Sequence, residues 1–128
     1  MGYYNDFSEL KGRQIVLVSG LEVDSEEVAF VCADGSRWRM FHSQDCCESV
    51  SIAEVIGDPS DAIGLVVDAR EETSEADPAG YVNNDDWRES FTWTFFVLQT
   101  ERGALTIRWL GQSNGWYSER AEFQRIDQ

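Results

Sequence analysis

Short apolar runs separated by turn-forming dipeptides restrict the fold of this chain more than any other feature. The segment "EVAFVCADGSRWRMFH" (residues 27–42) has Asp34-Gly35 between two apolar-rich arms, which is the strongest short-range signal for a β-hairpin. With Asp34 and Gly35 as a two-residue loop, Val31 is expected opposite Trp38. One face of the hairpin would then carry Ala29, Val31, Trp38, Met40 and His42.

A second hairpin is predicted near the C-terminus, where "SFTWTFFVLQ" and "ALTIRWLG" flank "TERG". Gly103 can take the left-handed position of a short loop, which pairs Thr100 with Ala104. The apolar side chains of both strands then fall on one face, as expected when one side of a hairpin packs on a core. That face would hold Phe91, Trp93, Phe95, Val97, Leu105, Ile107 and Trp109.

The rest of the chain also favours short strands, with two isolated turns of helix. Further strands are expected over residues 13–23, 49–57, 65–72 and about 117–126. "NDFSELKG" predicts a helical turn capped by Asn5 or Asp6, and "DPSDAIG" predicts another capped by Asp58.

These elements predict a mostly β fold. We expect one domain over residues 1–128, built as an antiparallel β-sandwich or partly open barrel of seven or eight short strands. Residues 73–89 carry acids and turn formers, with Tyr81 and Trp87 as apolar anchors. This span is predicted to be a long acidic loop within the domain.

The charge balance narrows the choice of partner. The chain has 24 acidic and 10 basic residues and a net charge of −14. Binding to nucleic acid or to an anionic membrane needs a clustered basic surface, and none is visible. An acidic surface instead favours a protein partner with basic character, because opposite charges steer association.

Cysteine usage points to a reducing compartment. Cys32, Cys46 and Cys47 are too few for a secreted disulfide framework, and the N-terminal residues lack the order of a signal peptide. We therefore expect a cytoplasmic protein, and no cofactor is predicted.

The densest run of chemistry is "HSQDCCES", residues 42–49. The spacing of His42, Asp45, Cys46, Cys47 and Glu48 does not fit the paired ligands of a structural zinc site, so no metal site is assigned. One alternative is a small thiol- or metal-dependent enzyme in which His42 activates Cys46 or Cys47. The favoured interpretation is a polar turn or docking edge with no catalytic residues.

Aromatic and arginine side chains supply further candidates for binding. Trp116 and Tyr117 follow the Asn114-Gly115 turn and are expected to be exposed contact residues. Arg108 is a candidate anion-binding fork. A second alternative function is therefore the sequestration of a nucleotide signal by Arg108 and Arg39, and binding of another small molecule also remains open.

The blocks "FHSQDCCESVSI", "TWTFF" and "TIRWLGQSNGWYSE" resemble an uncharacterised family of short proteins from bacteriophages and bacterial genomes. The resemblance covers roughly residues 38–57 and 90–123, and it implies a phage or prophage origin without an established activity. Its shared segments map to His42, Asp45, Cys46, Cys47, Glu48, Asn114, Tyr117 and Glu119. The leading hypothesis is a non-catalytic phage-type accessory domain, for host interaction or anti-defence, that binds a protein partner through its acidic surface.

Overall fold

The computed structural model describes residues 4–43, 48–76, 78, 90–113 and 118–127, and in them the chain forms one open antiparallel sheet of eight strands. The order across the sheet is β4-β7-β6-β5-β1-β2-β3-β8. The strands are β1 (Gln14–Ser19), β2 (Glu27–Cys32), β3 (Arg37–Phe41), β4 (Ser49–Ile56), β5 (Gly64–Ser74), β6 (Ser90–Thr100), β7 (Gly103–Ser113) and β8 (Glu122–Arg125). The predicted mostly β fold is confirmed.

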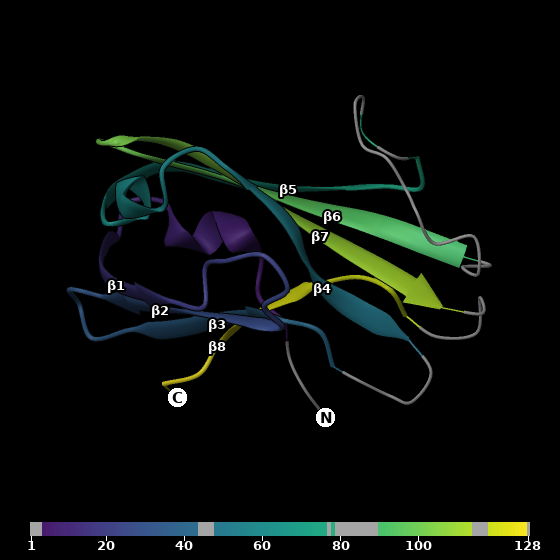
Figure 1. Cartoon of the computed structure of the whole chain (residues 1–128). Coiled ribbons are helices and arrows are strands. Elements are labelled where there is room, and N and C mark those ends of the chain that lie inside the picture. The colour runs from purple at the N-terminus through teal and green to yellow at the C-terminus, as the bar shows by residue number, and fades with distance from the viewer. Residues whose placement is uncertain (1–3, 44–47, 77, 79–89, 114–117, 128) are drawn as a thin grey trace.

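The sheet bends into two layers (Figure 1), called the upper layer, with β5, β6, β7 and β4, and the lower layer, with β1, β2, β3 and β8. Among the strands that the structure describes, those of the two layers pair with each other through a short ladder between β1 and β5, in which Gln14 pairs with Leu65 and Ile15 with Gly64. Because this ladder is so short, the two halves can turn toward each other and enclose a core, as in a sandwich.

Two 3-10 turns accompany the strands, η1 (Phe7–Leu10) and η2 (Pro59–Ala62). Both begin where the sequence predicts: the Asp6 side chain accepts from the Ser8 N–H, and the Asp58 side chain accepts from the Ser60 N–H. No helix in the described residues is long and apolar enough to cross a membrane.

Aromatic side chains from both layers fill the core. Phe7 of η1 makes edge contacts with Phe96 of β6 and Phe123 of β8, with ring centroids 5.0 and 5.1 Å apart. η1 lies between the layers (Figure 1) and joins them through this ring. Across the same core, the Trp109 Nε1–H donates to the Met40 sulfur at 3.0 Å. Trp38, Trp93 and Trp109, the tryptophans that the structure describes, are fully buried and contribute to packing.

Both edges of the sheet carry backbone contacts from connecting segments. At β4, the Asp24 N–H donates to the Ile52 carbonyl at 2.8 Å, and the Ile52 N–H donates to the Ser25 carbonyl at 2.9 Å. At β8, the Asn5 N–H donates to the Phe123 carbonyl at 2.7 Å. These contacts use backbone groups that an open edge would offer to another strand.

The register of the β2–β3 hairpin differs by one residue from the prediction. Phe30 pairs with Trp38, and the Cys32 N–H donates to the Ser36 carbonyl. The loop has three residues because Gly35, at φ 90°, adds a left-handed position after Asp34. The predicted face is therefore wrong for β2, and the buried face combines Val28, Phe30 and Cys32 with Trp38 and Met40.

The loop of the β6–β7 hairpin is one residue shorter than predicted, whereas that of the β2–β3 hairpin is one residue longer. Thr100 pairs with Gly103, which leaves Glu101 and Arg102 as a two-residue loop. Phe96 thus lies opposite Ile107 and points into the core, whereas Phe95 pairs with Arg108 on the outer face. Every predicted pair is therefore shifted by one residue: the predicted face of β7, with Leu105, Ile107 and Trp109, is correct, but the predicted face of β6 is inverted.

Candidate functional site

Residues 118–121, here called the crossover segment, connect the upper layer to β8 and pass directly over β7. A glycine at position 111 makes this passage possible. A Cβ there would lie 2.6 Å from the Glu119 carbonyl carbon and 2.8 Å from its Cα, and closer still to the carbonyl oxygen. Real Cβ contacts essentially never fall below 3.0 Å, so no side chain fits beneath the crossover segment.

The Glu119 carboxylate lies in a cradle of hydroxyl groups. Ser90 Oγ and Thr92 Oγ1 donate to Glu119 Oε1 at 3.1 and 2.9 Å, and Ser113 Oγ donates to Oε2 at 2.5 Å. Ser90 and Thr92 share a face of β6 because they are two residues apart, and Ser113 pairs directly with Ser90. With Glu119 only 7% exposed, these donors replace the water that a buried carboxylate loses.

His42 links the ends of two strands to the crossover segment. Its Nδ1 lies 2.8 Å from the Arg120 carbonyl oxygen, and its Nε2 lies 3.0 Å from Glu48 Oε2. A backbone carbonyl can only accept, so Nδ1 is the donor in the first contact, and Nε2 faces the carboxylate in the second. The His42 side chain is 3% exposed and that of Glu48 is fully buried. Both ring nitrogens are therefore engaged inside the protein.

Arg120 and Glu122 continue the polar network around the crossover segment. The Arg120 guanidinium pairs with Glu71 of β5, and the Ala121 N–H donates to Thr94 Oγ1 at 3.2 Å. Burial raises the pKa of Glu122 above its ordinary value, and the charge of Glu71 adds to the rise against the opposing effects of Arg120 and His42. The charged form of Glu122 is thus less stable in the folded chain than in the unfolded one.

Replacing Glu122 with glutamine is expected to raise the melting temperature at pH 7 by a few degrees or less. A raised folded-state pKa means that ionised Glu122 opposes folding, and the substitution removes this charge. The gain should disappear below about pH 4, where the carboxyl group is protonated in both states. Thermal unfolding of both proteins from pH 3 to pH 8 measures the difference, and a gain that persists at low pH would contradict the assignment.

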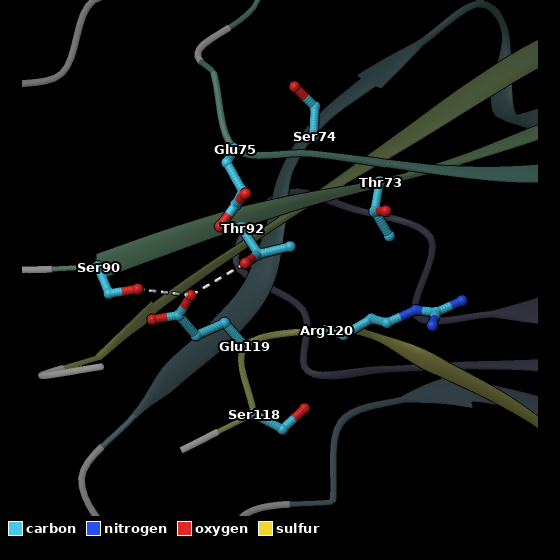
Figure 2. A pocket seen from close by; sticks show the side chains of 8 residues that line it. All are labelled: Thr73, Ser74, Glu75, Ser90, Thr92, Ser118, Glu119 and Arg120. Atoms are coloured by element: carbon cyan, nitrogen blue, oxygen red, sulfur yellow. Dashed lines mark hydrogen bonds between the residues drawn. The ribbon is translucent and has the colours of Figure 1, made fainter. Parts of the chain in front are cut away.

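Beside Glu119, the surface has a hollow of about 440 Å³ that is open to solvent. Figure 2 shows its walls, which come from the end of β5, the start of β6 and the crossover segment. The carboxylates of Glu75 and Glu119 point from opposite walls toward Thr92 (Figure 2). All of the residues that line the hollow are polar: Thr73, Ser74, Glu75, Ser90, Thr92, Ser118, Glu119 and Arg120.

The structure brings together three residues that the sequence selected. His42 contacts Glu48 directly, and Glu119 adjoins the residue whose carbonyl His42 contacts. The other candidates from those two segments lie outside the described residues: Asp45, Cys46, Cys47, Asn114, Trp116 and Tyr117. Sequence reasoning missed the hydroxyl cradle, although the alternation of Ser90, Thr92 and Thr94 was a visible signal for it.

Arg108 lies apart from this site. It pairs with Glu54 at 3.1 Å on the outer face of the upper layer, and its guanidinium lies 5.6 Å from the centre of the Phe95 ring. Arg39 lies on the outer face of the lower layer, where it contacts Gln124. The two arginines therefore do not share one cleft.

The fold and the site define an open, two-layered antiparallel β domain with a buried polar network at one crossing of the chain. Within the described ranges, no group of three or more His, Cys, Asp or Glu side chains is arranged to hold a metal ion. Residues 8–123 match the family model of a domain of unknown function, DUF7448, and the chain belongs to this family. No curated protein and no solved structure matches significantly.

Proposed function

We propose that the chain is a non-catalytic accessory domain of phage type that acts in the cytoplasm and binds a basic protein partner through its acidic surface. The observation that carries this proposal is how the chain uses its own basic residues. Most of those described are held in ion pairs with acids of the same chain: Lys11, Arg13, Arg39, Arg70, Arg108, Arg120 and Arg125. The excess negative charge is therefore left at the surface.

The connection between β1 and β2 concentrates part of this excess. Glu22, Asp24 and Glu26 are exposed there, and within the described parts of the chain none of the three takes part in an ion pair. Backbone contacts with Ile52 hold Asp24 and Ser25 against the edge of β4. These residues, called the β1–β2 loop below, thus present carboxylates from an anchored segment. Anchoring lowers the entropic cost of binding.

The state of His42 supports a binding role over a catalytic one. A general base needs a ring nitrogen that can reach a substrate proton. In this chain both nitrogens of His42 are directed to internal partners, and the ring is almost completely buried. This arrangement favours a structural role for His42, in which its ring holds the ends of β3 and β4 against the crossover segment.

Neutralising the three acids of the β1–β2 loop is expected to weaken partner binding by roughly tenfold, about 1.4 kcal/mol. The variant combines Glu22→Gln, Asp24→Asn and Glu26→Gln. Asparagine suits position 24 because the residue has a positive φ of 73°. The partner is captured from host lysate with the tagged protein, purified, and titrated calorimetrically at about 0.1 M and about 1 M salt, where the Debye length is about 10 Å and about 3 Å.

A matched variant removes the same number of charges elsewhere, with Asp68→Asn, Glu72→Gln and Glu101→Gln on β5 and the β6–β7 loop. Its affinity should stay within about threefold of the original, because rim charges far from a contact are screened. Equal affinity of all three proteins at both salt concentrations would refute the proposal, as would the absence of any captured partner.

A further inference from the structure

The hydrogen bonds around the hollow determine which groups its walls can offer. Ser90 Oγ and Thr92 Oγ1 both donate to Glu119, and Ser74 Oγ donates to the Ala76 carbonyl at 3.2 Å. A hydroxyl group has one proton and two acceptor lone pairs. Ser74 Oγ also accepts from the Ala76 N–H at 3.1 Å, so its hydroxyl is engaged with its own turn. Ser90 and Thr92 direct their protons to Glu119 and present acceptors to the hollow.

The charged groups of the hollow reinforce this polarity. Glu119 at the floor and Glu75 at the rim are carboxylates, which accept hydrogen bonds when ionised. Arg120 also lines the hollow, but its guanidinium is paired with Glu71 and extends away from Glu119 in Figure 2. The hollow therefore combines negative charge with a surplus of acceptors.

Size and lining composition limit the ligand further. About 440 Å³ lies within the range of roughly 300–1,000 Å³ found for small-ligand sites. Such sites are usually lined by apolar side chains, whereas every residue that lines this hollow is polar. An apolar ligand would leave these groups without water or partners, which is unfavourable. A ligand with several hydrogen-bond donors and positive charge avoids that loss.

We propose that the hollow binds a cation that carries N–H donors, of the primary ammonium or guanidinium type. The inference deepens the proposed function, on which it rests: the cation would be a lysine or arginine side chain of the basic partner, or a free amine of the same chemistry. Charge-assisted hydrogen bonds to Glu119, Glu75 and the Thr92 hydroxyl supply the recognition. The Glu119 carboxylate is already oriented by three hydroxyl groups, so little ordering is needed on binding.

The test is a titration of the ¹⁵N-labelled protein with n-butylammonium chloride, followed by backbone amide shifts at constant ionic strength. Saturable shifts are expected at Thr92 and Arg120. Tetramethylammonium has the same charge but no N–H donor, and it should bind at least fivefold more weakly. Equal binding of the two cations, or no saturable shift with either, would overturn the inference.

Two substitutions test the carboxylates. Glu119→Gln should weaken butylammonium binding at least fivefold, and Glu75→Gln at least twofold. Because Glu75 is exposed, its variant keeps the fold even if Glu119→Gln does not. Glu101→Gln, an equal charge change at an exposed residue that does not line the hollow, should leave the affinity unchanged. Unaltered binding in Glu75→Gln together with a folded, fully binding Glu119→Gln would also refute the site.

A blocked Gly-Lys-Gly peptide separates the two sources of the cation. Binding at least tenfold tighter than that of butylammonium assigns the hollow to a partner's side chain, and equal affinity assigns it to a free amine. The inference and the proposed function fail separately. A protein partner that binds with unchanged affinity to Glu75→Gln and Glu119→Gln, without any butylammonium binding, leaves the function standing and removes the hollow from it.

Discussion

Alanine at position 111 is expected to lower the free energy of unfolding by roughly 3 kcal/mol or more. Overpacking alone typically costs about 1–3 kcal/mol, and here the atoms that would have to move belong to the backbone of Glu119. Displacing the crossover segment also separates the Glu119 carboxylate from Ser90, Thr92 and Ser113. A hydrogen bond to a charged group contributes about 1.5–3 kcal/mol. Urea unfolding followed by tryptophan fluorescence measures the loss.

Gly12→Ala is the matched control for this variant. Gly12 has a φ of 83°, and a Cβ there would meet nothing within 4 Å. Its substitution introduces backbone strain without a steric clash and should lower the free energy of unfolding by about 1–2 kcal/mol. If Gly111→Ala costs no more than Gly12→Ala, the close approach of the crossover segment is not what requires glycine. A folded Gly111→Ala protein should in addition lose the butylammonium response of the hollow.

Local signals in the sequence were enough to predict the elements of this fold. Asp6 and Asp58 begin the two 3-10 turns because their side chains accept backbone N–H groups within two residues. The strands follow from apolar runs between glycine-containing turns. β5 nevertheless continues to Ser74, beyond its predicted end and into the span predicted as an acidic loop. Boundaries of this kind depend on the ladder with β6, which sequence alone does not supply.

The registers of the two hairpins could not be predicted from the same signals. A glycine after a polar residue suits both a two-residue loop and a three-residue loop with a bulge. At the first hairpin, Asp34 accepts from the Ser36 N–H at 2.8 Å, and Gly35 takes the extra left-handed position. At the second, Gly103 is already paired with Thr100. Each one-residue difference moved a whole strand's side chains to the opposite face.

The candidate site was predictable only in part, because some of its contacts are local in the sequence and others join distant segments. His42 and Glu48 belong to one short segment, so their proximity was a local expectation. Their link to Arg120 joins residues far apart in the sequence. This link depends on the close approach of the crossover segment to Gly111, which no hydrophobic periodicity in the sequence predicts. The sequence shows the hydroxyl residues Ser90 and Thr92. Because the predicted face of β6 was inverted, however, it placed them on the side away from the core.

Phe96→Ala is expected to destabilise the protein by about 3–5 kcal/mol, the usual cost of removing a buried phenylalanine ring. Phe96 is completely buried and contacts Phe7, which joins the two layers. The loss is a large part of the roughly 5–15 kcal/mol that stabilises a typical domain. Denaturant unfolding at 25 °C provides the comparison, with the midpoint and the slope fitted separately so that a change in the denatured state is recognised.

Phe95→Ala removes the same ring one residue away and serves as the matched control. Phe95 is partly exposed on the outer face, where it stacks with Trp93 at a centroid distance of 5.9 Å. Losing this contact and the nearby Arg108 guanidinium should cost about 1–1.5 kcal/mol. The order of the two losses reports the register directly, because a strand shifted by one residue exchanges the faces of Phe95 and Phe96. A larger loss for Phe95→Ala would place β6 in the register predicted from the sequence and would remove Thr92 from the Glu119 cradle.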